Sequence, residues 1–139
     1  MGFTNNSAKD LEVVYEETSK LIPYALNSRT HSDEQVSQVA ASIQEFGFTS
    51  PILIDEQCGI IAGHGRLMAS KKLGLEKVPT ITLSGLSKAQ KKAYVIADNK
   101  LALNAGWDVE ALKTEILALE ENSFDLQLLG FEIEELKAI

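Results

Sequence analysis

Gly59-Ile60-Ile61-Ala62-Gly63-His64-Gly65-Arg66-Leu67-Met68-Ala69 is the stretch from which the architecture of this chain can be worked out. Its apolar run predicts a short buried strand, which turns sharply through two glycines into a helix that carries a histidine and an arginine. Glycine allows backbone conformations and close approaches that a Cβ would prevent. The first turn of a helix leaves N–H groups unpaired and suits an anion, and an arginine fork can hold phosphate in two places. The candidate phosphate-binding residues are therefore Gly63, His64, Gly65 and Arg66. The alternative is an ordinary strand-to-helix turn with a solvated histidine and arginine.

The distribution of charge supports an anionic ligand near this stretch. The chain of 139 residues has a net charge of −7, which argues against a strongly basic nucleic-acid binder. Residues 63–100 nevertheless carry a net charge of +6, whereas residues 1–62 carry −6 and residues 101–139 carry −7. A basic segment that begins at the glycine turn favours phosphate or DNA as its partner. Lysines that only keep two helix faces soluble remain the alternative.

Composition predicts one compact domain with an appendage. No apolar run reaches the length of a transmembrane helix, and residues 1–10 lack the pattern of a signal peptide. The single cysteine, Cys58, excludes an internal disulfide and fits a reducing cytoplasm. We therefore expect a cytoplasmic protein that does not enter a membrane.

Before the glycine turn, the chain predicts a polar leader (1–10), a strand at Leu11–Tyr15 and an irregular loop at Pro23–Thr30. Arg29 in that loop is either a surface arginine or a phosphate contact. Ser32 matches a helix cap, and the helix that follows should end before Gly47. A short buried strand is expected at Pro51–Asp55.

After the glycine turn, the helix should end at Gly74, and Val78–Leu83 should form a strand. Pro79 near its beginning suggests an edge strand or a strand start. We expect residues 11–86 to form a mixed α/β core with short strands. Residues 87–139 should form a helical extension that packs on this core.

The extension begins with a long helix capped by Ser87, and Asp98-Asn99-Lys100 lies in its last turns. Carboxylate and amide oxygens are ligands that Mg²⁺ accepts when it also holds phosphates, so Asp98 and Asn99 are candidate metal ligands. An exposed helix end without a ligand is the alternative. Asp108 should cap a further helix, and Trp107 before it should act as a packing anchor.

The ordered series of these motifs resembles the ParB/sulfiredoxin-like superfamily, and specifically the ParB-like N-terminal domain. The resemblance covers about residues 13–108. It is carried by Asn-Ser-Arg, Ser-Ile-Gln-Glu-Phe-Gly, Pro-Ile-Leu-Ile, Ile-Ile-Ala-Gly-His-Gly-Arg and Gly-Leu-Glu-Lys-Val-Pro. It implies a small α/β core whose Gly-x-x-Arg turn binds a nucleotide or phosphate.

In chromosome-partitioning members the turn reads Gly-Glu-Arg-Arg and helps to bind CTP. Gly63 and Arg66 fit that pattern, and Arg29 matches a loop arginine of the same pocket. These members then carry Glu-Asn-x-Gln-Arg for Mg²⁺ and phosphates. Here Asn99 matches and Asp98 replaces the glutamate, while leucine and alanine replace the last two residues.

A second resemblance extends into the latter part of the chain. Ala-Asp-Asn-Lys-Leu-Ala-Leu-Asn-Ala-Gly-Trp-Asp, followed by a helix and Leu-Gly-Phe-x-x-Glu-Glu-Leu, is similar to phage and prophage ParB-like proteins. In those proteins the module often precedes a DNA methyltransferase. The present 139 residues contain no Asp-Pro-Pro-Tyr motif, so we expect either a standalone module or the front part of a longer protein.

Three functions follow from this sequence. The leading hypothesis is a module that binds CTP or ATP with Mg²⁺ and acts on or beside DNA, with segment 63–100 as the DNA contact and a homodimer as its assembly. The second is an enzyme of the same fold, either an NTPase, a DNA nuclease or a small-molecule kinase, with His64 and Asp98 as candidate catalytic residues. The third is an adaptor, such as the regulatory domain of a methyltransferase.

Overall fold

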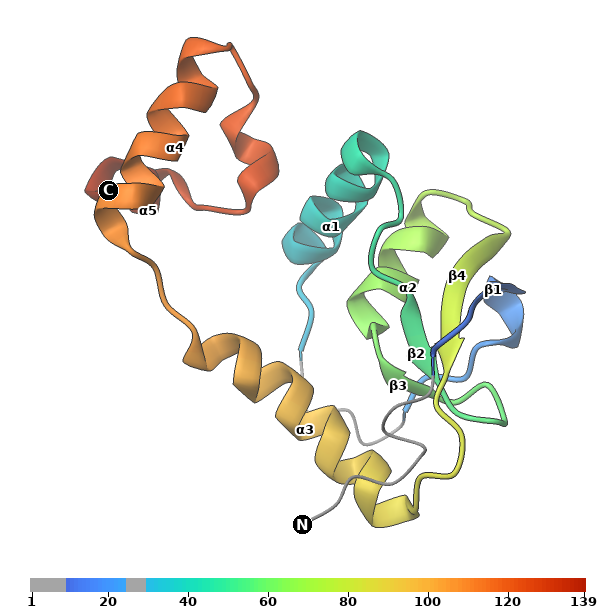
Figure 1. Cartoon of the computed structure of the whole chain (residues 1–139). Helices are drawn as coiled ribbons and strands as arrows, with labels where there is room; N and C mark the ends of the chain where they lie inside the picture. The colour runs from blue at the N-terminus through green and yellow to red at the C-terminus, as the bar shows by residue number, and fades with distance from the viewer. Residues whose placement is uncertain (1–9, 25–29) are drawn as a thin grey trace. The chain divides into compact units, whose positions relative to one another are not determined.

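The computed structural model describes residues 10–24 and 30–139, which form two compact units (Figure 1). The first unit ends at Asp98. Its elements are β1 (Val13–Glu17), the 3-10 turn η2 (Thr18–Lys20), α1 (Asp33–Phe46), β2 (Ile52–Ile54), β3 (Ile60–Ala62), α2 (His64–Lys72), β4 (Lys77–Thr82) and the first part of α3 (Lys88–Asn104). The second unit begins at Asn99, inside α3. The predicted division of the chain into a core (11–86) and an extension (87–139) stays a prediction.

A four-stranded mixed sheet in the order β1-β4-β2-β3 forms the centre of the first unit. β1 is antiparallel to β4, β2 is parallel to β4, and β2 is antiparallel to β3. β4 is therefore an interior strand, so the edge-strand alternative for Pro79 is wrong, and Pro79 instead lies near the start of β4 (Lys77–Thr82). Pairing with β2 begins at Thr80, one residue later, so proline lies where its missing N–H disrupts little of that ladder.

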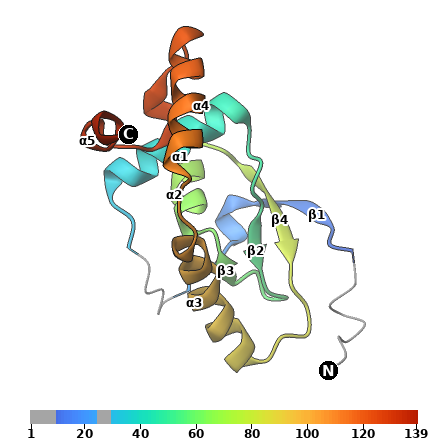
Figure 2. The same cartoon turned by 60° about the vertical axis from the view of Figure 1, so that its left-hand side comes forward.

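Two clusters of buried side chains hold this unit together. The larger one joins β2, β3 and β4 to α2 and consists of Leu21, Ile52, Ile54, Ile60, Leu67 and Val78. The smaller one joins α1 to α2 and consists of Val36, Ala40 and Ala69. α1 packs on α2, and α2 packs on β2, as the turned view in Figure 2 allows the reader to follow.

The helix ends agree with the local sequence signals. The Ser32 hydroxyl accepts the N–H of Gln35, and α1 ends at Phe46 before Gly47. Ser87 and Gln90 exchange side-chain-to-backbone hydrogen bonds at the start of α3. These bonds satisfy helix-terminal groups that would otherwise lack a partner.

The second unit continues α3 and adds α4 (Val109–Glu121), η3 (Leu126–Leu129) and α5 (Ile133–Ala138). The Asp108 carboxylate caps α4 by accepting the N–H of Ala111. Trp107 lies 5.6 Å from Phe131 between ring centroids, yet its side chain is 67% exposed. It is a packing contact within this unit, and the packing of the extension on the core stays a prediction.

The predicted fold class is confirmed: a mixed-sheet α+β core is followed by helices. Of the helices in the described part of the chain, none combines the length and apolar character needed to span a membrane.

Candidate functional site

The turn between β3 and α2 requires glycine at position 63. Gly63 has a φ of 110° and precedes α2 as its N-cap, where its carbonyl accepts the N–H of Leu67 at 2.9 Å. A Cβ at this position would lie 3.0 Å from Nη2 of Arg66 and 3.2 Å from Cγ1 of Ile52. The glycine therefore satisfies the backbone conformation and leaves room for the arginine beside the turn.

Arg66 lies on the first turn of α2 with its guanidinium partly buried. Nη2 donates to the carbonyl oxygen of Pro51 at 3.1 Å. Within the described residues, Nε is buried and has no hydrogen-bond partner. Burial lowers the pKa of Arg66, while the negative charge of Asp98 and the nearby Tyr94 act in the opposite direction. An arginine with an ordinary pKa far above neutrality stays charged, so this buried donor is suited to an anion.

His64, the first residue of α2, is oriented by the loop before α1. Its Nε2 accepts the backbone N–H of Tyr24 at 3.0 Å, which places a neutral ring's proton on Nδ1. Burial and repulsion from His31 lower the pKa of His64 below its ordinary value of 6.5. The neutral imidazole is thus the form that fits this hydrogen bond.

Gly65 is buried because the imidazole of His31 lies against it. A Cβ on Gly65 would meet Nδ1 and Cε1 of His31, each at 3.1 Å. The Nδ1 atom of His31 lies 2.9 Å from Oε1 of Gln35 on α1. His31 was not among the predicted site residues, since a single histidine before a helix cap carries no motif.

The predicted metal ligands Asp98 and Asn99 lie at the boundary of the two units. The Tyr94 hydroxyl donates to Oδ1 of Asp98 at 3.5 Å, and burial together with Asp98 raises the pKa of Tyr94. Residues 10–24 and 30–139 contain no group of three or more histidine, cysteine, aspartate or glutamate side chains that could hold a metal ion.

A cavity of about 410 Å³ lies in the first unit, between the β2–β3 turn, the loop before α1 and the first turns of α3. Its walls are mainly apolar, with Ile22, Pro23, Ile60, Ile61 and Val95, and its polar lining includes Tyr24, Asp55, Lys88, Lys91 and Lys92. Tyr24 connects this cavity to the glycine turn, because its N–H is the donor to His64.

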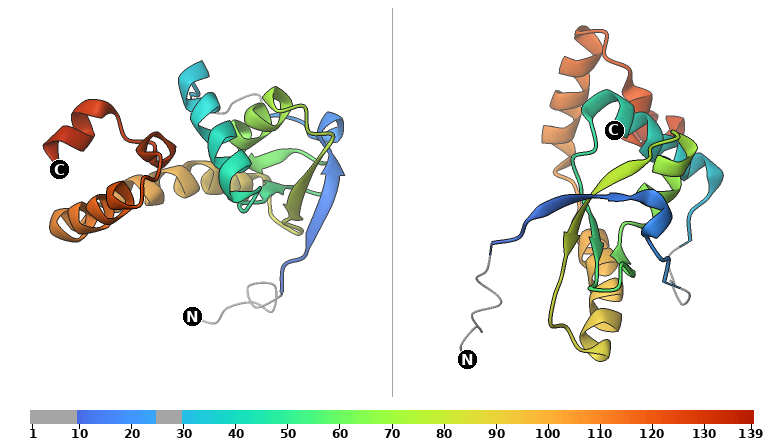
Figure 3. Two further views of the ribbon diagram at one scale, coloured as in Figure 1. Left: turned by 90° about the horizontal axis from the view of Figure 1, so that it is seen from above. Right: turned by 90° about the vertical axis from the view of Figure 1, so that its right-hand side faces the viewer.

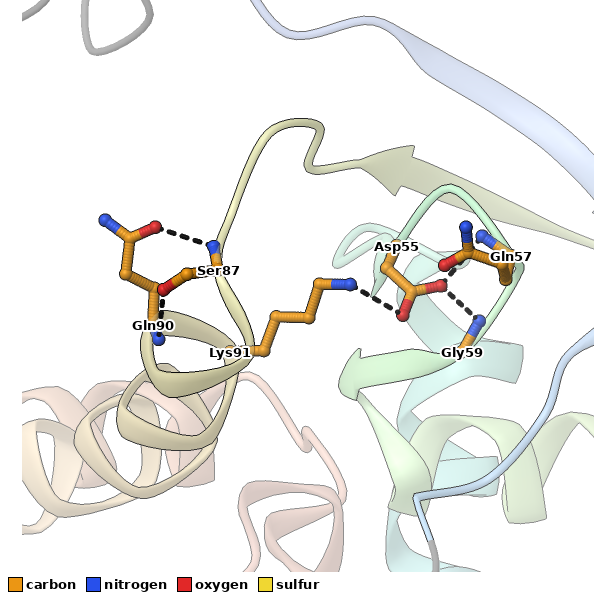
Figure 4. Close-up of polar contacts among 6 residues, drawn as sticks. All are labelled: Asp55, Gln57, Gly59, Ser87, Gln90 and Lys91. Atoms are coloured by element: carbon orange, nitrogen blue, oxygen red, sulfur yellow. Dashed lines mark hydrogen bonds and ion pairs between the residues drawn. The ribbon is translucent and has the colours of Figure 1, made fainter.

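An ion pair joins two walls of the cavity (Figure 4). Oδ2 of Asp55 lies 3.3 Å from Nζ of Lys91, while Oδ1 accepts the N–H groups of Gln57 and Gly59 at 2.9 and 2.8 Å. Burial opposes ionisation of Asp55, but the two N–H donors and Lys91 outweigh it and lower the pKa. Sequence reasoning missed this pair, whose members are 36 residues apart and belong to no motif.

The structure divides the basic segment that the sequence places in one block. Lys88, Lys91 and Lys92 line the cavity, whereas Lys71 and Lys77 line a separate hollow with acidic neighbours. Arg66 is beside the glycine turn, and Lys72 donates to the Ser37 hydroxyl at 2.6 Å. The predicted contact from Arg29 lies outside the described residues.

The sequence of this chain is similar to those of several known proteins. Residues 4–99 match the model of the ParB N-terminal domain. The ParB-like nuclease domain-containing protein YnaK of Escherichia coli K12 is 53% identical over 85 residues, which span 61% of this chain and 98% of YnaK. A nucleoid occlusion protein of Bacillus cereus is 32% identical over 96 residues, but the match spans 62% of this chain and only 33% of that protein.

Solved structures share the fold. Truncated Caulobacter crescentus ParB, complexed with CTP-γ-S, matches with a TM-score of 0.69 and 23% identity over 90% of this chain and 74% of that chain. Sulfiredoxin from Arabidopsis thaliana matches with a TM-score of 0.51 and 22% identity over 60% of this chain and 97% of that chain.

The fold of this chain is thus like the fold of ParB and of sulfiredoxin. With the family model matching most of its length, this chain belongs to the ParB N-terminal domain family.

Proposed function

We propose that this chain binds a nucleotide, CTP or ATP, with its phosphates at the turn formed by Gly63, His64, Gly65 and Arg66. The observation that carries the proposal is the buried Nε of Arg66, which has no partner in the described part of the chain. A buried donor without an acceptor is costly, and an arginine fork matches the geometry of phosphate oxygens. A bound phosphate would supply the missing acceptor.

The helix start adds neutral donors to this charge. α2 has no side-chain cap, and the first N–H that bonds back to Gly63 belongs to Leu67. Within residues 10–24 and 30–139 no hydrogen-bond partner is seen for the N–H groups of the first turn, an arrangement that suits a helix-terminal anion site. In this proposal His64 contacts phosphate as a neutral donor through Nδ1, and Arg29 remains a proposed further contact.

The adjacent cavity is the proposed place of the nucleoside. Its apolar walls suit a base, and its lysines suit the phosphate end of the ligand. The complex of Caulobacter ParB with CTP-γ-S supports CTP as the first nucleotide to test. A Mg²⁺ ion would take most of its oxygens from phosphates and water, with Asp98 and Asn99 as proposed further ligands.

Calorimetric titration with CTP, ATP and GTP, each with and without Mg²⁺, tests the proposal. We expect one nucleotide to bind selectively and Arg66→Ala to weaken its binding by roughly 10- to 100-fold, the loss of a charge-assisted contact. Arg66→Lys keeps the charge but not the fork, so it should recover only part of the affinity.

Lys113→Ala is the matched control, because it removes one positive charge from exposed α4. Thermal unfolding of each variant separates a lost ligand contact from a lost bond to Pro51. Unchanged nucleotide affinity in folded Arg66→Ala would contradict the proposal.

DNA is the proposed macromolecular partner, contacted through segment 63–100, and a homodimer is the proposed assembly. Caulobacter ParB has also been solved in complex with the centromeric parS site. A gel-shift assay at two salt concentrations tests DNA binding, since contacts to phosphates weaken steeply with salt.

Catalysis is the second candidate, and the name of YnaK favours a nuclease over other reactions. His64 and Asp98 are the proposed catalytic residues. Nicking of plasmid DNA in the presence of Mg²⁺, or release of phosphate from CTP or ATP, would support it when His64→Gln abolishes the activity. An adaptor role beside a methyltransferase, and a place in the cytoplasm, remain further proposals.

A further inference from the structure

β1 is an edge strand, and among residues 10–24 and 30–139 no strand pairs with its outer side. Within those residues its partner is β4, and Figure 3 shows β1 crossing the front of the strands in the right-hand view. The opposite edge is different, because Ile22 closes it: the N–H of Ile22 donates to Cys58, and the Ile22 carbonyl accepts from Ile60. An edge strand without such cover presents a row of backbone groups to another chain.

The register of the sheet identifies which groups face outward. Thr18 N–H donates to the carbonyl of Glu76 at 2.9 Å, in continuation of the β1–β4 register. Antiparallel pairs alternate between bonded and non-bonded positions, so the backbone groups of Glu16 and Val14 face β4. Those of Val13, Tyr15 and Glu17 therefore face away from the sheet. Pro79 agrees with this phase, because it lies opposite Tyr15 and has no N–H to give.

The side chains of this edge are apolar and acidic together. Leu11 is 59% exposed, Val13 51% and Tyr15 61%. Asp10, Glu12, Glu16 and Glu17 supply four carboxylates, and no basic residue occurs from Asp10 to Ser19. A large apolar exposure on a strand edge suits a strand-shaped partner, and the carboxylates select its charge.

A second copy of this chain is a poor occupant of the edge. Pairing β1 with another β1 would bring two strongly acidic segments together, and like charges in facing strands repel. We propose that β1 accepts an extended segment of a partner protein in which lysine or arginine alternates with apolar residues. The segment adds a fifth strand beside β1, bonded to the backbone of Val13, Tyr15 and Glu17.

The proposal is tested on the full chain with two labelled hexapeptides, acetyl-Lys-Val-Thr-Val-Lys-Val-amide and its analogue with glutamate in place of lysine. We expect the cationic peptide to bind at least about fivefold more tightly, a ratio that should shrink as salt is raised. Amide chemical shifts should change along β1 and β4 rather than at the glycine turn.

Two variants separate backbone pairing from charge. Val13→Pro removes one outward N–H and should weaken the cationic peptide at least about fivefold. Glu12→Lys combined with Glu16→Lys should transfer the preference to the acidic peptide, and it does not depend on the proline variant folding. Glu120→Lys combined with Glu121→Lys is the control at exposed positions of α4, and it should leave the cationic preference unchanged.

Equal binding of the two peptides, no binding of either, or shifts confined to other surfaces would overturn the proposal. In that case the carboxylates only prevent edge-to-edge association, as charges on edge strands commonly do. The nucleotide titrations do not enter this test, so its failure leaves the proposed phosphate site unaffected.

Discussion

At the scale of single residues, Gly63 links backbone conformation to the placement of Arg66. Gly63→Ala forces a Cβ into a φ of 110° and against the arginine and Ile52, so both strain and crowding should destabilise the fold. We expect a loss of about 2–3 kcal/mol in the free energy of unfolding, measured by urea denaturation.

Gly74→Ala is the control for that experiment. Gly74 also has a positive φ, 72°, but a Cβ there meets nothing within 4 Å. It should lose only the conformational part, about 1 kcal/mol. Equal losses of unfolding free energy in the two variants would mean that crowding against Arg66 does not destabilise the Gly63→Ala variant.

His64 gives a second residue-scale prediction, which concerns pH. Because its pKa is lowered in the folded chain, the unfolded chain binds more protons in the interval just below 6.5. The stability contributed by neutral His64 is therefore present above 6.5 and lost as the pH falls toward the folded pKa. NMR titration of the His64 ring should show a midpoint below 6.5.

Replacement of His31 by glutamine provides the comparison for that titration. It removes the electrostatic repulsion from His31, the smaller of the two causes of the lowered pKa, so the midpoint of His64 should move back toward 6.5. A midpoint at or above 6.5 in the unmodified chain would contradict the role assigned to burial and to His31.

At the scale of elements, the Asp55–Lys91 pair connects the β2–β3 turn to α3. Asp55→Asn should cost about 1–2 kcal/mol at neutral pH, because two turn N–H groups and Lys91 lose a charged acceptor. Lys91→Ala should cost less, about 0.5 kcal/mol, since it removes only a partly exposed ion pair.

The destabilisation caused by Asp55→Asn should depend on pH, because the pKa of Asp55 is lowered in the folded chain. A carboxyl group with a lowered folded pKa stabilises the chain above its unfolded value of 3.8 and loses this effect as the pH falls through the folded value. Urea denaturation at pH 7 and pH 3 should therefore show the penalty of Asp55→Asn shrinking in acid. A penalty that is constant with pH would assign the effect to shape rather than charge.

α3 also shows where helical periodicity misleads. The spacing of Ala89, Ala93, Ile96 and Ala97 predicts one apolar stripe along this helix. Instead Val95 is 6% exposed and lines the cavity, while Ile96 is 62% exposed. Alanine side chains bury little apolar area, so a stripe made mainly of alanines does not fix which face of α3 packs. The face that packs is the one with Val95 and Lys91, which line the cavity.

At the scale of the whole molecule, the two units differ in how much they bury. Two clusters of buried side chains lie in the first unit. In the second unit, residues 99–139, which the structure describes throughout, one residue is buried, Ile116. Hydrogen exchange should therefore protect β2 and β4 by a larger factor than α4. Equal protection across both units would indicate a single cooperative body.

Local signals sufficed for the helix caps and the turn at Gly63, because each depends on residues adjacent in the sequence. They also located the strands, although β1 is Val13–Glu17 and the predicted Leu11–Tyr15 was wrong in its bounds. The starts of α1, α3 and α4 follow from Ser32, Ser87 and Asp108, whose side chains bond to the backbone three residues later. The candidate phosphate site also belongs to this category, as glycines, a histidine and an arginine at a helix start.

Long-range contacts decided the rest. Burial of Arg66 depends on the Pro51 carbonyl, orientation of His64 depends on Tyr24, and the cavity depends on Asp55 and Lys91. The interior place of β4 likewise arises from strand order. The sequence by itself determined the elements and the glycine turn, because their interactions are local. Only the tertiary structure decided which side chains are buried and which edge stays open, because those depend on residues far apart in the chain.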